Sequence, residues 1–163
     1  MYSSSIYYYK YLKSKNVFHL SKMSKEILVC VSGYFNPLHK GHLEYFRKSK
    51  ELGDKLVVIV NNDNQAILKH GSSFMKDKDR LEIIRALKVV DFAILSVDED
   101  RTVCKTLEII NPDIFANGGD QFNTSIPEAE VCMSNNIKLA DGLGGKIESS
   151  SWLLKRANEK KTI

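Results

Sequence analysis

Cysteine, proline and tryptophan are scarce in this sequence of 163 residues, which contains three, three and one of them respectively. The cysteines, Cys30, Cys104 and Cys132, form no Cys-x-x-Cys pair and no other paired spacing, which argues against a disulfide framework or a cysteine metal site. We expect all three to pack in the core of a cytoplasmic protein, where thiols stay reduced. Long apolar runs are also missing. None approaches the length of about 18 residues that can span a membrane, so no membrane partner is expected.

Acidic residues are absent from the first 25 positions, which hold five lysines and five of the seven tyrosines. Subtracting these five lysines from the net charge of +4 leaves −1 for the rest of the chain. A body with this charge has no general attraction for nucleic acid. The N-terminal segment also lacks the apolar stretch of a signal peptide. We interpret residues 1–24 as a variable or disordered extension and residues 25–163 as one domain. An arm docked at a dimer interface is the alternative interpretation of the extension.

From Glu26 onward, short apolar runs alternate with amphipathic segments. The apolar runs are rich in β-branched residues, as strands buried on both faces are; they lie at 27–31, 56–61, 92–97, 113–116 and 137–140. Helical patterns lie near 42–52, 79–87, 101–110, 127–135 and 149–157. This alternation predicts an α/β fold, namely a single Rossmann-like domain whose five-stranded parallel sheet is covered by helices on both faces.

Residues 33–42, Gly-Tyr-Phe-Asn-Pro-Leu-His-Lys-Gly-His, directly follow the first predicted strand and lead into a helix. Glycine allows a close backbone approach to a ligand, and a helix N-terminus attracts anions. His39 and His42 are three residues apart, close to one helical turn, so both side chains can point into the same ligand site. We therefore predict that both histidines bind phosphate. Zinc ligation is the competing interpretation, but no third ligand of suitable spacing is present, and we predict no metal site in the chain itself.

Further polar segments follow the second, fourth and fifth predicted strands, at residues 61–63, 117–120 and 142–151. Ligands of a parallel sheet bind at the carboxyl ends of its strands, where the winding reverses. These segments are therefore predicted to meet the histidine segment at one edge of the sheet.

Residues 33–42 match the pattern Gly-x-Phe-[Asp/Asn]-x-x-His-x-Gly-His, and the sequence resembles the nucleotidyltransferase superfamily that carries this motif. The resemblance extends from about residue 25 to about residue 156. The order of weaker signals further along resembles the cytidylyltransferase-like branch, which includes glycerol-3-phosphate cytidylyltransferase and heptose-1-phosphate adenylyltransferase. These signals are Lys69, Asp79-Arg80, Val90-Asp91, Pro112-Asp113-Ile114, Gly118-Gly119-Asp120 and Ser149-Ser150-Ser151.

The resemblance implies an in-line attack by an acceptor phosphate on the α-phosphorus of ATP or CTP, with pyrophosphate leaving. His39, His42 and Lys69 would be the catalytic residues, and Mg²⁺ would be bound through the triphosphate. The implied nucleotide-binding residues are Gly33, Tyr34, Phe35, Asn36, Gly41, Gly118, Gly119, Asp120, Lys146, Ser149, Ser150 and Ser151. Acceptor binding is expected at Asn62, Asp63 and Arg80, although a surface salt bridge is an equal interpretation of Arg80. The family also implies a homodimer.

Three departures from the branch leave the substrates open. Asn36 stands where aspartate is common, and Asn36-Pro37 resembles mononucleotide adenylyltransferases. Asn117 replaces the lysine of a Lys-Gly-Gly-Asp segment, and no arginine leads into Ser149. We predict transfer of AMP or CMP to a small phosphorylated sugar or polyol. The alternatives are a nicotinamide or nicotinate mononucleotide adenylyltransferase and a catalytically silent nucleotide-binding regulator.

Overall fold

The computed structural model describes residues 26–118, 126–143 and 150–159. Its centre is a five-stranded parallel sheet in the order β3-β2-β1-β4-β5. The strands are β1 (Leu28–Gly33), β2 (Lys55–Val60), β3 (Phe92–Leu95), β4 (Ile114–Ala116) and β5 (Lys138–Ala140). The chain winds outward from β1 to β3 and then crosses back to β4, so the direction of winding reverses between β1 and β4. The predicted fold class is confirmed.

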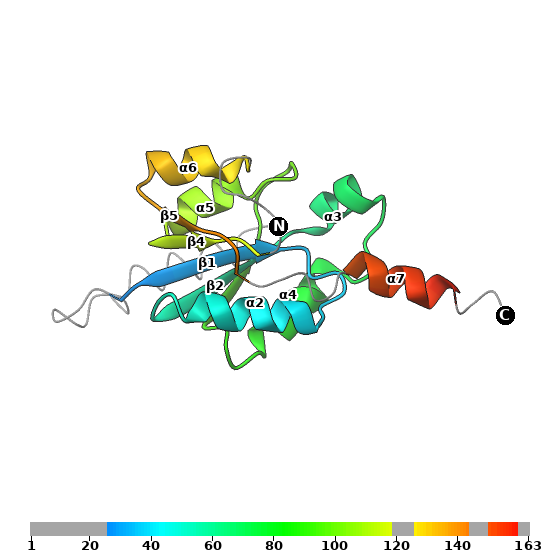
Figure 1. Cartoon of the computed structure of the whole chain (residues 1–163). Coiled ribbons are helices and arrows are strands. Elements are labelled where there is room, and N and C mark those ends of the chain that lie inside the picture. Colours follow the sequence, from blue (N-terminus) through cyan, green and yellow to red (C-terminus); the bar gives the residue numbers. More distant parts are fainter. Residues whose placement is uncertain (1–25, 119–125, 144–149, 160–163) are drawn as a thin grey trace.

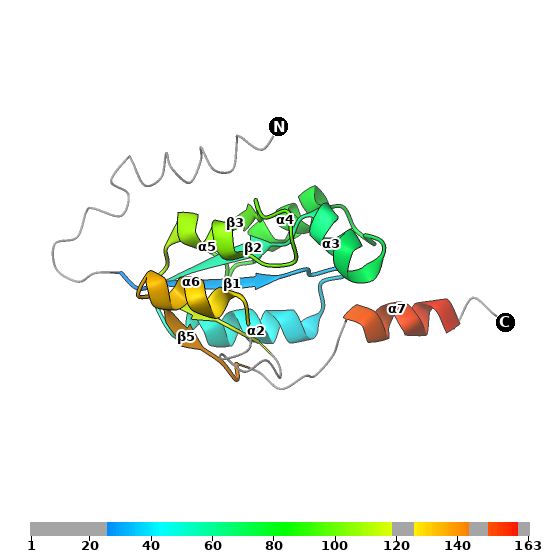
Figure 2. The same ribbon diagram turned by 90° about the horizontal axis from the view of Figure 1, so that it is seen from above.

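Helices lie on both faces of this sheet (Figure 1). The side chains of α2 (Lys40–Lys50) and α4 (Asp77–Arg85) pack on one face, and those of α5 (Cys104–Ile110) and α6 (Glu128–Ser134) pack near the other. The helix α3 (Asp63–His70) lies at the carboxyl edge of the sheet, and α7 (Ser150–Glu159) projects away from the body beyond the start of α2 (Figure 2).

The two faces follow from the period of a strand, in which successive side chains point to opposite sides. Val29 and Val31 of β1 belong to the core cluster under α2 and α4. Cys30, between them, belongs to the cluster under α5. All three are fully buried. A strand with apolar residues at every position is therefore satisfied only when helices cover both faces, as they do here.

The sequence patterns predict no helix over residues 63–70, because residues 61–63 are predicted to bind a ligand. The sequence nevertheless carries both signals that bound a helix. The Asn62 side chain accepts a hydrogen bond from the backbone N–H of Gln65 at 3.0 Å, which caps the first turn. Gly71 ends the helix in the left-handed conformation, at φ 78°.

All three cysteines carry thiols without disulfide bonds, and Cys30 and Cys132 are buried, whereas Cys104 is half-buried. Within the described residues, no helix is long and apolar enough to cross a membrane.

Candidate active site

A cavity of about 760 Å³ lies at the carboxyl ends of β1 and β4, where the winding of the sheet reverses. The walls come from segments far apart in the chain: the motif after β1, the end of α3, the loop after β3, the end of β4 and the start of α7. The predicted site residues that line it are Gly33, Tyr34, Phe35, Asn36, His42, Lys69, Gly118 and Ser150. Folding therefore brings together residues that the sequence separates by more than 100 positions.

The two histidines form the first turn of α2. His39 is the N-cap residue, and the imidazole rings of His39 and His42 stack with their centroids 3.7 Å apart. The backbone N–H of His39 donates to Nδ1 of His42 at 3.2 Å. An imidazole nitrogen that accepts a hydrogen bond carries no proton. The neutral His42 ring therefore carries its proton on Nε2 and can donate it to a ligand.

The charge state of His42 follows from its surroundings. Removal from water and, to a lesser extent, the neighbouring His39 together lower the pKa of His42 to about 3. His42 is thus neutral at physiological pH before any ligand binds. The structure therefore favours a neutral hydrogen-bond donor over an imidazolium cation at this position.

The ring of Phe35 packs against His42 and supports its position. The backbone of Phe35 has φ 48°, in the left-handed region that bulky residues avoid. This conformation turns the ring inward, where it is 2% exposed and packs edge-on against His42 and Phe46, with centroids 4.9 and 5.2 Å away. A Cβ atom at Gly33 would lie 2.7 Å from this ring. Gly33 therefore makes room for the Phe35 ring and also lines the cavity; its predicted contact with the nucleotide stays a prediction.

Gly118 shows the same pattern at the end of β4. A Cβ atom there would lie 3.0 Å from the ring of Tyr45, whose hydroxyl donates to the carbonyl of Ala116. The glycine next to the cavity thus serves close packing against α2 in addition to any approach of a ligand.

Lys69 lies in the last turn of α3, with its Nζ 4.2 Å from the centroid of the Tyr34 ring. This distance is within the range of a cation–π contact. Partial removal from water lowers the pKa of Lys69, and the positive charge of Arg101 lowers it further. Lys69 therefore reaches the cavity from a helix that lies outside the predicted helical segments.

Arg101 is a cavity residue that the sequence analysis did not identify. It lies in the loop between β3 and α5. Burial raises the pKa of the Tyr34 hydroxyl, and the positive charge of the nearby Arg101 opposes this rise. The signal was present, because the loop follows the carboxyl end of a strand, as every other candidate segment does. Site residues are predicted after the first, second, fourth and fifth strands but not after the third.

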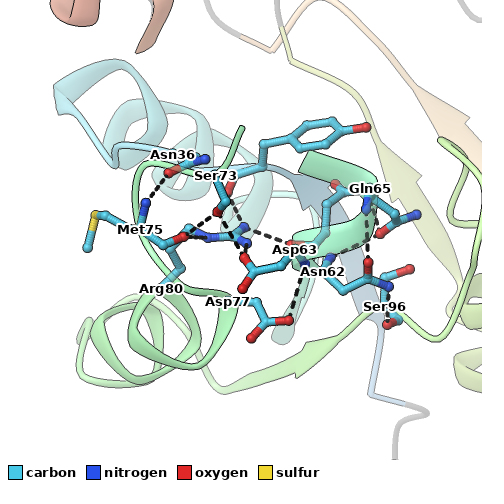
Figure 3. A network of polar contacts seen from close by, with 11 residues as sticks. Asn36, Asn62, Asp63, Gln65, Ser73, Met75, Asp77, Arg80 and Ser96 are labelled. Atoms are coloured by element: carbon cyan, nitrogen blue, oxygen red, sulfur yellow. Dashed lines mark hydrogen bonds and ion pairs between the residues drawn. The ribbon is translucent and has the colours of Figure 1, made fainter. Parts of the chain in front are cut away.

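Arg80 is 1% exposed and occupies the centre of a polar network (Figure 3). Its guanidinium donates to the carbonyls of Tyr34, Asn61 and Met75 at 2.6, 2.7 and 3.0 Å and forms an ion pair with Asp63 at 2.9 Å. These contacts tie the loops after β1 and β2 to α4. Both side chains are engaged in this pair, and neither lines the cavity; the acceptor contact predicted for them stays a prediction. The pair is internal, not the surface salt bridge of the alternative interpretation.

Asn62 and Asn36 also hold the frame of the site. Both N–H bonds of the Asn62 amide are used by the carbonyls of Ser96 and Asp98, at 3.1 and 2.8 Å. With its oxygen capping α3, Asn62 has both amide N–H groups and its oxygen engaged within the protein, and its predicted contact with the acceptor stays a prediction. Asn36 Oδ1 accepts from the backbone N–H of Met75 at 2.8 Å (Figure 3). That bond fixes the segment after α3 against the motif.

The remaining predicted residues divide by position. The hydroxyl of Ser150, in the first turn of α7, donates to the carbonyl of Pro37 at 2.8 Å and thus attaches α7 to the motif. Gly41 lies in the first turn of α2. The predictions for Gly119, Asp120, Lys146 and Ser149, and for the side chain of Ser151, fall outside the described part of the chain.

Comparison with known proteins agrees with this geometry. The model of the cytidylyltransferase-like family matches residues 30–142, more than half of the chain. The chain belongs to the cytidylyltransferase-like family. The predicted superfamily and branch are thereby confirmed, and with them the enzyme class, a nucleotidyltransferase.

This cytidylyltransferase-like chain covers nearly the whole length of one relative but only part of another. It is 36% identical over 140 residues to FAD synthase of Thermoplasma volcanium, covering 82% of this chain and 95% of the relative. It is 34% identical over 113 residues to bifunctional protein HldE of Helicobacter pylori strain P12, covering 68% of this chain. The chain spans only 24% of the length of that second relative.

Solved structures give the same fold. The lipopolysaccharide core biosynthesis protein of Thermoplasma volcanium is 36% identical, with a TM-score of 0.62, covering 71% of this chain and 95% of that one. Pantoate-beta-alanine ligase of Francisella tularensis is 13% identical, with a TM-score of 0.58, covering 90% of this chain and 67% of that one. The second likeness shows the fold alone.

Proposed function

We propose that this nucleotidyltransferase joins AMP, taken from ATP, to the phosphate of FMN and releases pyrophosphate. The observation that carries the transfer reaction is the placement of a neutral His42 donor and the cations of Lys69 and Arg101 around one cavity. The acceptor is suggested by the FAD synthase relative, of which the chain covers 95%. FMN carries its phosphate on a ribityl chain, so it belongs to the phosphorylated polyols predicted from the sequence.

In the proposed reaction, a phosphate oxygen of FMN attacks the α-phosphorus of ATP. A new P–O bond forms while the bond from the α-phosphorus to the bridging oxygen of pyrophosphate breaks. Negative charge increases on the leaving oxygens during this step. Nε2–H of His42 and the N–H groups at the start of α2 would donate to them, and such preorganised donors stabilise the transition state.

Lys69 and Arg101 would hold the two phosphate groups together. Both approach Tyr34 from separate elements, α3 and the loop after β3. Within the described residues, neither forms an ion pair with a carboxylate, so both charges are available to an anion. Two polyanionic substrates repel each other strongly, and cations between them lower the cost of bringing them into line.

Mg²⁺ fits this site as an ion carried by the triphosphate. In the described part of the cavity, Glu128 is the one carboxylate in the lining, and its Oε1 already accepts from the backbone N–H of Val103 at 3.0 Å. Mg²⁺ commonly keeps several waters and binds through substrate phosphates. The ion would supply charge neutralisation on the triphosphate. The family-based homodimer stays a prediction.

A second acceptor class, the sugar 1-phosphates, is favoured by two of the similar proteins. One is bifunctional protein HldE, and the other is the lipopolysaccharide core biosynthesis protein. The same cations would hold a sugar phosphate, because the group recognised is again a phosphate monoester. The two classes differ in what lies beyond the phosphate, a flat ring system in FMN and a hydroxylated ring in a sugar.

The test is an acceptor panel. Pyrophosphate release is measured with Mg²⁺ and either ATP or CTP, against FMN, glycerol 3-phosphate, several sugar 1-phosphates and nicotinamide mononucleotide. We expect the highest kcat/KM for ATP with FMN. A higher value for a sugar 1-phosphate or for nicotinamide mononucleotide would replace FMN by that acceptor. Nucleotide binding without turnover across the panel would instead support the silent regulator.

A further inference from the structure

Asn117 lies at the reversal point of the sheet, directly after β4. Its backbone N–H donates to the carbonyl of Ala140 at 2.7 Å, which extends the pairing with β5 and fixes its position. It follows Phe115 by two residues, so both side chains lie on the face of the sheet covered by α5 and α6. The residue is therefore held by the sheet itself and not by a loop.

The side chain of Asn117 is only 8% exposed, yet it lines the cavity. Within the described residues, its Nδ2 is a buried donor with no hydrogen-bond partner. Folded proteins pair almost all their buried polar groups, because an unpaired donor loses its water without gaining a substitute. The torsion of a terminal amide is broad, so a small rotation turns this donor toward the cavity.

The lining of the cavity combines apolar and cationic side chains. The apolar ones are Val103 and Phe115, which are 2% and 1% exposed, and Ile126 with Pro127. The cations are Lys69 of α3 and Arg101 of the loop after β3. A ligand with phosphates at one end and a flat ring at the other matches a cavity that offers both cations and apolar side chains.

We infer that Asn117 recognises the ring of a substrate, donating from Nδ2 to a carbonyl oxygen or an unprotonated ring nitrogen of a flat heteroaromatic group. This inference rests on the proposed function for the choice of ligands. The ring is either the base of the nucleoside triphosphate or the ring system of the acceptor, and both present such acceptor atoms. Asn117 is one of the positions at which the sequence departs from its branch, where lysine precedes Gly-Gly-Asp, so this donor distinguishes the chain from relatives that carry the lysine.

The variant Asn117→Leu tests the inference, because leucine is close to asparagine in size and removes the donor. Binding of ATP, CTP, FMN and inorganic tripolyphosphate is measured by calorimetry for the wild type and the variant. We expect roughly tenfold weaker binding of the ligand whose ring Asn117 contacts, as for the loss of one hydrogen bond. Tripolyphosphate has no ring, and its affinity should stay unchanged. Loss for the nucleotides alone identifies the base, and loss for FMN alone identifies the acceptor ring.

Thermal unfolding of the same proteins gives an independent readout. If Nδ2 is unpaired in the protein without ligand, Asn117→Leu raises Tm by about 2–4 °C. Unchanged affinity for all three ring ligands, or equal weakening of tripolyphosphate, would overturn the inference. A lower Tm in both Asn117→Leu and Asn117→Ala would show a structural role and overturn it too. If the wild type binds none of the ring ligands, the proposed function fails, and the Tm comparison alone then decides whether the donor is unpaired.

Discussion

His42 is predicted to act as a neutral donor, and two substitutions separate its two nitrogens. The amide nitrogen of glutamine reaches the position of Nε2, whereas the amide of asparagine reaches that of Nδ1. His42→Asn therefore keeps an acceptor for the backbone N–H of His39, 3.2 Å from Nδ1 in the wild type, and loses the donor toward the cavity. His42→Gln keeps a donor at the cavity and loses the acceptor for His39.

The expected size of the effect follows from the charge stabilised at this position. Removing one preorganised donor from a site of developing charge lowers kcat by about 10²–10³, or about 2.7–4 kcal/mol. We expect a loss of this size for His42→Asn and a clearly smaller loss for His42→Gln. Initial rates of pyrophosphate release at saturating substrate measure both. Equal losses in the two variants would contradict the assignment of the donor to Nε2.

The pH dependence tests the charge state of His42. With a pKa of about 3, lowered by removal from water and by His39, only about one His42 ring in ten thousand is protonated at pH 7. The neutral donor then persists at every pH well above 3. kcat/KM reports the pKa values of the enzyme without ligand. The wild type and His42→Gln should therefore share the same pH profile between about pH 5.5 and 8. A fall in the wild type as pH rises through about 6.5, absent from His42→Gln, would show that the imidazolium is the active form.

Three further variants test the frame and the cationic wall. Arg80→Met leaves the carbonyls of Tyr34 and Asn61 without their buried donor and breaks the ion pair with Asp63. We expect a loss of about 3 kcal/mol in the free energy of unfolding, measured in urea. An unchanged urea midpoint would contradict the network. Arg101→Gln is expected to raise the KM of the phosphate acceptor roughly tenfold, whereas the exposed Arg47→Gln should leave it unchanged; equal values for both would remove Arg101 from the site. Gly33→Ala forces a Cβ to within 2.7 Å of the Phe35 ring, so we expect a loss of about 1–3 kcal/mol in the free energy of unfolding. kcat should fall as well, because the Phe35 ring packs against His42. A loss of stability without any change in kcat would contradict this support of His42.

The sheet could be predicted because each strand is recognisable in the sequence as a short apolar run. Residues 29–31 are apolar without interruption, which requires cover on both faces, and the alternation with helical segments then leaves few topologies. The observed strands differ from the predicted ones by one or two residues at their ends. Such ends are set by hydrogen bonds to neighbouring strands, as where the Ser96 N–H pairs with the Val60 carbonyl beyond β3.

The site was predictable where a residue faces the ligand and obscure where it supports another residue. His42 and Lys69 line the cavity, as the motifs suggested. From the sequence, the charge of Arg80 fits substrate binding as well as an internal polar network. Its burial and its four hydrogen bonds, which appear only in the structure, show that it belongs to an internal network. Gly33 is similar, because the ring that fills its vacant space comes from a left-handed Phe35 that no propensity predicts.

The central claim, that this cavity carries out nucleotidyl transfer, is tested most directly by following the phosphorus atoms of the nucleoside triphosphate. ATP labelled at the α-phosphorus and ATP labelled at the γ-phosphorus are incubated separately with Mg²⁺, the best acceptor of the panel and either the wild type or His42→Asn. The account predicts that the α-label appears in the acceptor and the γ-label in pyrophosphate, and that both signals fall by about 10²–10³ in the variant. Transfer of the γ-label to the acceptor, or equal transfer by the wild type and the variant, would contradict it.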